Sequence, residues 1–209
     1  MKLNNIVLLS ALVLVGTTQA TQFEISAAKQ NVFTQRLLRG MDKALRLSVQ
    51  EALSNRIRWQ VGEYHNIDIE MAFGNGTGVK SVTQDVPEQN ALWYVNNIEL
   101  MGQKQKTEAL MSREDGHVIK LIVNGEEQDP NQDEGELEII EQYQTKVTVP
   151  AGSFDCFYIK AKQTSKGQEP QEFEVWINPT DVNLDGMLKV VVQSQFGPVT
   201  MTLTKFGKK

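Results

Sequence analysis

The spacing of apolar residues changes once along the chain, near residue 56. Before that point apolar side chains recur every three to five residues, as at Ile25, Leu45 and Ala52, which is the spacing of one helix face. From there onward apolar and polar residues alternate, as they do in strands that bury one face. We therefore expect one helix, or two that meet near Gly40, over residues 23–55 and strands over residues 56–207.

Turn signals divide the second region into short strands. Asn124-Gly125, Asp185-Gly186 and Gly197-Pro198 are typical of tight connections, and strands joined this closely pair antiparallel. The predicted strands cover 56–61, 64–73, 78–86, 91–100, 104–113, 117–123, 136–149, 153–164, 171–178, 186–195 and 198–206. The expected fold class is α+β: an N-terminal helix (or two) followed by a large curled antiparallel sheet, a half-barrel, in one domain over residues 21–209.

Some of the predicted strands are apolar on both faces. In the strand 153–164, Phe154, Cys156 and Tyr158 alternate with Phe157 and Ile159. A sheet with one face in water should instead show one polar face. We therefore expect both faces to be covered, one by the N-terminal helix and the other by the curled sheet itself, a loop or a ligand.

The first twenty residues have the layout of a signal peptide. Lys2 gives a positive start, an apolar run follows from Ile6 to Val15, and Thr18 and Ala20 are small residues where signal peptidase requires them. The apolar run is shorter than the roughly 20 residues that a membrane-spanning helix needs. The sequence thus predicts cleavage after Ala20 and a periplasmic protein that does not span the membrane.

Charge is distributed unevenly along the chain. The formal net charge of -5 does not favour a nucleic-acid partner. In the predicted helix, however, Arg36, Arg39, Lys43 and Arg46 follow steps of three and four residues and share one face. This basic stripe is either a surface that docks to an anionic envelope surface or an ordinary solvated helix face that could pair with the acidic sheet.

Catalytic motifs are missing from the sequence. Ser153 follows a glycine but has no recognisable base, and the two histidines, His65 and His117, stand in polar contexts. Cys156 is the only cysteine, so an internal disulfide is excluded. It is either a reactive thiol or a small apolar side chain within a strand. We expect no enzymatic activity and no cofactor.

One turn has the alternation of a calcium-binding loop. Asp181, Asn183 and Asp185 occupy positions one, three and five, and Gly186 occupies position six. Position twelve is Val192, where a calcium loop has glutamate. The alternation is explained equally by turn chemistry, because Asp and Asn hydrogen-bond their own backbone.

Methionine and tryptophan are the best candidates for lining an apolar cavity. Flexible thioethers suit acyl chains of variable shape, although they also fill ordinary cores. The candidate lining residues are Trp93, Met101, Met111, Trp176, Met187 and Met201.

Two segments near the C-terminus carry a resemblance to known proteins. Val149-Pro150-Ala151-Gly152-Ser153-Phe154, followed by Trp176-Ile177-Asn178-Pro179, resembles a pattern of uncharacterised Gram-negative envelope proteins. The layout of signal peptide, helix and meander is similar to the half-barrel of periplasmic lipoprotein carriers of the LolA/LolB type. This resemblance implies a curled sheet whose concave face, capped by helices, shelters an acyl chain. No carrier motif matches position by position, so it assigns no binding residues.

Two functional hypotheses follow from these patterns. The first is a non-enzymatic binding or carrier module for an apolar ligand, such as a lipid or a lipoprotein acyl chain. The second is an envelope structural or interaction protein with a filled core and no ligand, whose contact surface is the basic stripe or the acidic sheet edge.

Overall fold

A computed structural model describes residues 57–72, 74–100, 102–130, 136–164, 170–194 and 197–209. Within these residues the chain forms one antiparallel sheet of eleven strands and a single 3-10 turn, η1 (Pro87–Gln89). The strands are β1 (Glu63–Met71), β2 (Gly74–Val86), β3 (Ala91–Leu100), β4 (Gln103–Ser112), β5 (Val118–Val123), β6 (Glu126–Gln128), β7 (Glu136–Val149), β8 (Gly152–Thr164), β9 (Gln171–Ile177), β10 (Met187–Ser194) and β11 (Gly197–Lys208).

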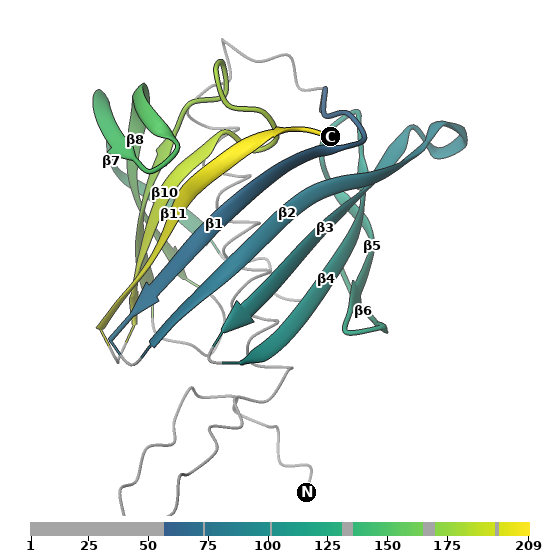
Figure 1. Ribbon diagram of the computed structural model, residues 1–209, viewed down its shortest axis with the longest axis horizontal. Helices are drawn as coiled ribbons and strands as arrows, with labels where there is room; N and C mark the ends of the chain where they lie inside the picture. Colours follow the sequence, from purple (N-terminus) through teal and green to yellow (C-terminus); the bar gives the residue numbers. More distant parts are fainter. Residues whose placement is uncertain (1–56, 73, 101, 131–135, 165–169, 195–196) are drawn as a thin grey trace, which may run out of the picture.

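The sheet consists of two meanders that join at its centre. The strand order is β6-β5-β4-β3-β2-β1-β11-β10-β9-β8-β7. Each strand pairs with its neighbours in sequence, except that β6 and β7 do not pair and that β11 pairs with β1. In that pairing Ile67 lies opposite Leu203 and Ile69 opposite Met201. Figure 1 shows that the sheet is strongly curved. It is also open, because β6 and β7 are its edges.

The predicted α+β class is wrong for the part of the chain that the structure describes, which is an antiparallel sheet with no α-helix. The antiparallel meander itself is as expected. The predicted strand 56–61 is also incorrect, since residues 57–62 form a connecting segment whose Ile57 and Trp59 pack onto the sheet around Tyr94. The predicted helical segment 23–55 and the signal peptide 1–20 lie outside the described residues.

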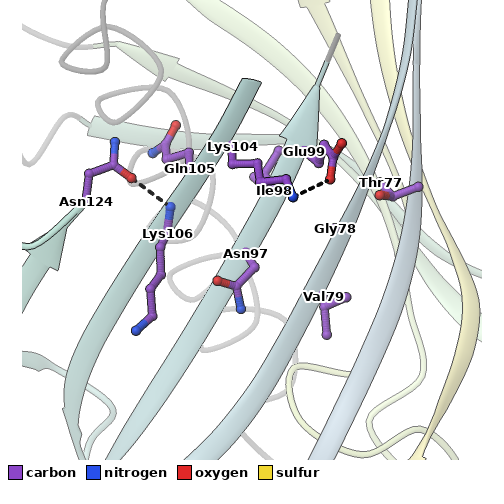
Figure 2. Close-up of a pocket in the computed structure, with 10 residues that line it drawn as sticks. All are labelled: Thr77, Gly78, Val79, Asn97, Ile98, Glu99, Lys104, Gln105, Lys106 and Asn124. Atoms are coloured by element: carbon purple, nitrogen blue, oxygen red, sulfur yellow. Dashed lines mark hydrogen bonds and ion pairs between the residues drawn. The ribbon is translucent and has the colours of Figure 1, made fainter. Parts of the chain in front are cut away.

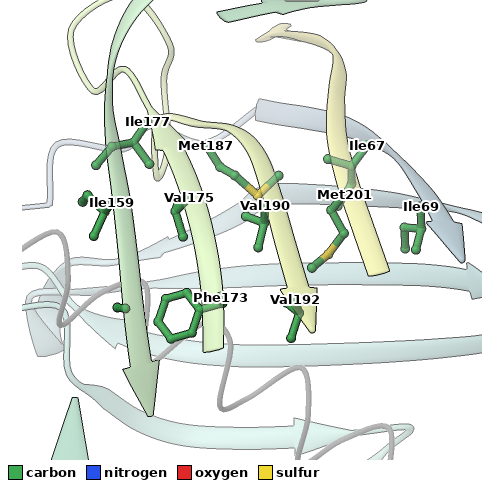
Figure 3. Packing of buried hydrophobic residues seen from close by; sticks show 11 residues of the cluster. Ile67, Ile69, Ile159, Phe173, Val175, Ile177, Met187, Val190, Val192 and Met201 are labelled. Atoms are coloured by element: carbon green, nitrogen blue, oxygen red, sulfur yellow. The ribbon is translucent and has the colours of Figure 1, made fainter. Parts of the chain in front are cut away.

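The inner face of the curve carries the largest apolar cluster, part of which Figure 3 shows. Ile98 of β3 and Ile139 of β7 stand on opposite arms of the sheet, yet both pack against this cluster. Asp185, in the connection that follows β9, contacts Lys80 of β2 on this same face. Side chains from the two arms can meet in this way only inside the curve, so this face is concave. We call the buried members the concave apolar cluster: Ile67, Ile69, Ile159, Ala161, Phe173, Val175, Ile177, Met187, Val190, Val192 and Met201.

The β9–β10 connection, residues 178–186, folds back over one end of the concave face. Leu184 has a φ of 53°, which is uncommon for a bulky residue, and its side chain packs against Val82, Leu92 and Tyr94. Gly186 has a φ of +66°, and a Cβ there would lie 2.9 Å from the Asn178 carbonyl oxygen. The connection is thus held tightly onto the sheet.

Candidate functional site

The concave face changes from apolar to polar in the direction of the β9–β10 connection. Ile67, Gly78 and Ile98 lie in register across β1, β2 and β3. Two residues further along each strand, and hence on the same face, the next row is polar. It consists of His65, Lys80, Asn96 and Thr107 on β1 to β4, which we call the polar row. Its members are 0%, 3%, 3% and 3% exposed.

An ionic contact joins the polar row to the β9–β10 connection. The Lys80 ammonium donates a hydrogen bond to Asp185 Oδ2 at 2.6 Å and lies 3.4 Å from Met187 Sδ. His65 Nε2 is 3.1 Å from Asn183 Oδ1. Its Nδ1 is 3.4 Å from Asp185 Oδ1, which is an ion-pair distance, although this atom makes no directed hydrogen bond in the structure. Two of the three residues of the predicted calcium loop therefore face the polar row.

The electrostatics of Asp185 follow from these neighbours. Burial by itself raises the pKa of this carboxyl. The positive charge of Lys80, together with the contacts from His65, outweighs the burial and holds the pKa of Asp185 well below its usual range. Asp185 is consequently the ionised partner that makes a buried lysine tolerable in the sheet.

The structure also places the third residue of the predicted calcium loop. Asp181 Oδ2 accepts a hydrogen bond from Asn178 Nδ2 at 2.7 Å, away from Lys80 and His65. Within the described ranges no three carboxylate, histidine or cysteine side chains gather as metal ligands do. Calcium binding at this turn stays a prediction, and it would require Asp185 to leave the Lys80 ammonium.

Among the residues that the structure describes, three buried polar atoms at this end of the concave face have no hydrogen-bond partner: His65 Nδ1, Tyr94 Oη and Asn96 Oδ1. Tyr94 is two residues from Asn96 on β3 and shares its face. Burial, and secondly the negative charge of Asp185, raises the pKa of Tyr94, so its hydroxyl remains a neutral donor. An unpartnered buried polar group costs about 1–3 kcal/mol and calls for an explanation.

The predicted cavity-lining residues divide between the two faces of the sheet. Met187 and Met201 belong to the concave apolar cluster, and Met111 packs beside Leu92 on the same face. Trp93 lies on the outer face in a small cluster with Leu110. Met101 lies outside the described residues, as do the predicted docking residues Arg36, Arg39, Lys43 and Arg46.

Trp176 is the other lining candidate on the outer face. Its ring centroid is 5.0 Å from that of Tyr158, and the Lys189 ammonium lies 5.0 Å from the centre of the indole ring. This arrangement combines a cation–π contact with an edge-to-face aromatic pair across β8, β9 and β10. Trp176 is thus separated by the sheet from Met187 and Met201.

A pocket of about 460 Å³ opens on the outer face of β2 to β4. Figure 2 shows its residues, among which Val79, Asn97 and Lys106 lie in register. They alternate with Lys80, Asn96 and Thr107, so they point away from the polar row. Lys104 and Glu99 form an exposed ion pair of 3.6 Å at this pocket. Its described lining contains no histidine, cysteine or serine.

Cys156 is buried, at 5% exposure, in a cluster where the β7–β8 hairpin packs against the β9–β10 connection and β11. Burial, with a smaller contribution from Asp155, raises the pKa of the thiol. Reactive cysteines show the opposite shift. The environment therefore favours the small apolar side chain among the two interpretations of this residue.

Sequence reasoning missed the polar row. Lys80, Asn96 and Thr107 are each followed by a polar residue, so their immediate neighbours do not show that they face inward. The available signal lies in β3, where Asn96 shares the face of Leu92 and Tyr94. Only the register across four strands brings the polar residues together.

Comparison with known proteins gives structural likeness alone. The sequence matches no protein-family model and no curated protein. Among solved structures, the chain is similar to a Bacteroides fragilis protein regarded as exported, with a YmcC-like fold, at 15% identity and a TM-score of 0.43; the match covers 75% of this chain and 100% of that one.

Two further solved structures show comparable likeness. A protein of Parabacteroides distasonis regarded as a lipoprotein matches at 11% identity and a TM-score of 0.39, over 72% of this chain and 97% of that one. MucB in the Pseudomonas aeruginosa MucA/MucB complex matches at 13% identity and a TM-score of 0.41, over 81% of this chain and 56% of that one. At such values function must be argued from the geometry of this chain alone. The structure contains no helix, within its described ranges, of the length and apolar character needed to cross a bilayer.

Proposed function

We propose that this chain is an exported, non-enzymatic protein of the bacterial envelope that binds an apolar ligand, such as a lipid or lipoprotein acyl chain, on the concave face of its sheet. Export is suggested by the signal-peptide pattern of residues 1–20. A non-enzymatic role is suggested by the motif-poor sequence.

The observation that carries the proposal is the composition of the concave apolar cluster. All of its buried members among the described residues come from strands of the one sheet. A single sheet layer has to bury its apolar face against something else, since packed domains are built from at least two layers. An acyl chain would supply that second layer at about 25 cal/mol per Å² of apolar surface removed from water.

A second function, an envelope structural or interaction protein with a filled core, is favoured by a different observation. Met187 and Val190 are 0% exposed, and the pocket described above opens on the opposite face. In this alternative the concave face is packed permanently and the outer surface makes the contacts.

Native mass spectrometry on the mature protein, purified from the periplasm without detergent, tests the two functions. A bound apolar ligand should appear as a reproducible mass excess that releases fatty acyl species. A clean polypeptide mass that stays unchanged after incubation with lipids would reject the carrier function and support the filled core.

A matched pair of variants connects any bound mass to the concave face. Met201→Gln places an amide in the concave apolar cluster, whereas Val79→Gln changes an outer-face side chain that is already 38% exposed. Binding of the apolar fluorophore N-phenyl-1-naphthylamine should weaken only in Met201→Gln, with circular dichroism verifying that both variants fold. Equal binding by both variants would place the ligand elsewhere.

A further inference from the structure

We propose that the polar row and Tyr94 form a recognition site for the head of the ligand, and that this head is uncharged and bears hydroxyl groups. The inference rests on the proposed function, because it assigns the head of an amphiphile whose chain lies on the concave apolar cluster. It specifies a ligand class that the apolar cluster alone does not define.

The first argument is the hydrogen bonding that the protein leaves unmade. Tyr94 Oη can donate and Asn96 Oδ1 can accept, and His65 Nδ1 accepts in the tautomer whose Nε2–H donates to Asn183 Oδ1. All three belong to side chains that are more than nine-tenths buried. A hydroxyl both donates and accepts, so one or two hydroxyl groups complement this set, whereas a group that only accepts would leave Asn96 unsatisfied.

The second argument is the charge balance. The one buried cation of the polar row, Lys80, is already paired with Asp185 at 2.6 Å. An anionic head would have to compete with Asp185 for Lys80 and would add a second negative charge to the same buried region, which is costly. A neutral head avoids both penalties.

The third argument is position. The row next to Asn96, Lys80 and His65 on the same face is Ile98, Gly78 and Ile67, and Ile67 is a member of the concave apolar cluster. The side chain of Ile67 covers Gly78 in that row, since a Cβ there would come within 2.7 Å of Ile67 Cδ1. A molecule bound along the strands would therefore contact an apolar row with one part and the adjacent polar row with the next. An amphiphile needs this arrangement for its chain and its head.

The test compares ligands that differ only in the head. Displacement of N-phenyl-1-naphthylamine from the mature protein would be measured with a C16 monoacylglycerol, a C16 alkyl glucoside and a C16 fatty acid methyl ester. We expect at least one hydroxyl-bearing ligand to bind about tenfold more tightly than the ester, the factor expected for one hydrogen bond. The first two ligands distinguish a glycerol head from a sugar head.

Variants then assign the preference to these residues. Tyr94→Phe and Asn96→Leu should each reduce the preference to about threefold or less while the ester still binds as before. Asn97→Leu, on the outer face of the same strand, is the matched control and should keep the full preference. Tyr94→Phe removes only an unpartnered hydroxyl, so this variant should fold even if Asn96→Leu does not.

The outcomes separate this inference from the proposed function. If the ester and the hydroxyl-bearing ligands bind equally, or if both variants keep the preference, bound water satisfies these atoms and the head-group site is rejected while apolar binding stands. If the wild-type protein binds neither the fluorophore nor any lipid, the proposed function fails and this inference fails with it.

Discussion

Lys80 is a charged side chain, 4% exposed, within a sheet face, and its burial depends on one carboxylate. Removing one member of a buried ion pair lowers stability more than replacing both members with apolar residues, because the remaining charge stays desolvated. The same reasoning explains why Asn183 and Asp185 face inward: the β9–β10 connection supplies the groups that the polar row needs. Asn183 and Asp185 of this turn therefore provide partners for buried polar groups of the sheet.

The first prediction concerns this pair. Asp185→Asn leaves the Lys80 ammonium buried without a counter-charge and should lower the free energy of unfolding by about 3–5 kcal/mol, measured by urea denaturation at neutral pH. The matched control is Asp155→Asn in the exposed Lys146–Asp155 pair, where the nitrogen–oxygen distance is 3.8 Å and the side chains are 66% and 90% exposed. The control should change little. Similar losses in both variants would contradict the role given to Asp185.

The second prediction is the pH dependence of the same contact. Because the pKa of Asp185 is lowered in the folded state, the unfolded protein takes up a proton at this site as the pH falls while the folded protein does not. The stabilisation is complete above the ordinary aspartate pKa of about 3.9 and decreases below about pH 5. The difference in unfolding free energy between wild type and Asp185→Asn should therefore shrink between pH 6 and pH 3.

Asp115 does not disturb this comparison. Its pKa is also lowered, by hydrogen bonds from Ser112 and His117, but it titrates in both proteins and cancels in the difference. A constant gap between wild type and Asp185→Asn across this pH range would show that the folded-state pKa of Asp185 is not lowered.

At the scale of strands, β2 approaches its neighbours closely because it contains glycines within the sheet. A Cβ on Gly76 would lie 2.5 Å from the Glu99 carbonyl oxygen of β3, and a backbone atom cannot move aside as a side chain can. The glycine-rich start of β2 therefore belongs to the pairing with β3, although its composition in sequence is that of a turn.

The third prediction follows from this contact. Gly76→Ala should destabilise the protein by about 1–3 kcal/mol through overpacking against β3, measured by thermal or urea unfolding. Gly207→Ala in β11 is the control, because the atoms nearest to a Cβ there belong to the Tyr64 side chain and begin at 3.5 Å, an ordinary van der Waals distance. That control should be neutral or slightly stabilising, since alanine restricts the unfolded chain. Equal effects of the two substitutions would refute the close approach of β2 and β3.

At the scale of the whole molecule, the joint between β1 and β11 determines the organisation. It connects the first and last strands of the sheet and places them in its middle, with paired neighbours on both sides. The edges differ sharply from this centre: β6 has three residues, and residues 140–144 of β7 are exposed throughout. Stability should therefore decrease from the joint toward both edges.

The fourth prediction is this gradient, measured by hydrogen–deuterium exchange and mass spectrometry on the mature chain. Peptides from β1, β11 and β10 should exchange most slowly, and those from β6 and from residues 140–144 of β7 most quickly. Uniform exchange across the sheet would contradict the gradient and indicate that the described sheet opens as one unit. Fastest exchange in β1 and β11 would contradict the central joint.

The sequence alone determined the local properties: alternating strands, tight turns such as Asn124-Gly125, and antiparallel pairing of neighbours. These depend on residues close in the chain, whose periodicity and turn chemistry can be seen directly. The expectation of covered faces also came from the alternation in the strand that became β8. The strand boundary near residue 56 could not be predicted. Ile57 and Trp59 have the spacing of a strand, but they belong to a segment that is not part of the sheet and pack against it around Tyr94.

Only the tertiary structure decided which face of each strand is concave and which side chains meet there. The pairing of β1 with β11 joins residues more than 120 positions apart, and the Lys80–Asp185 contact joins residues 105 positions apart. No local pattern specifies such pairs, since a shift of one residue in register would send each side chain to the opposite face. For that reason Met187 and Met201 could be proposed from composition, whereas the polar row and Tyr94 emerged only from the register of the folded sheet.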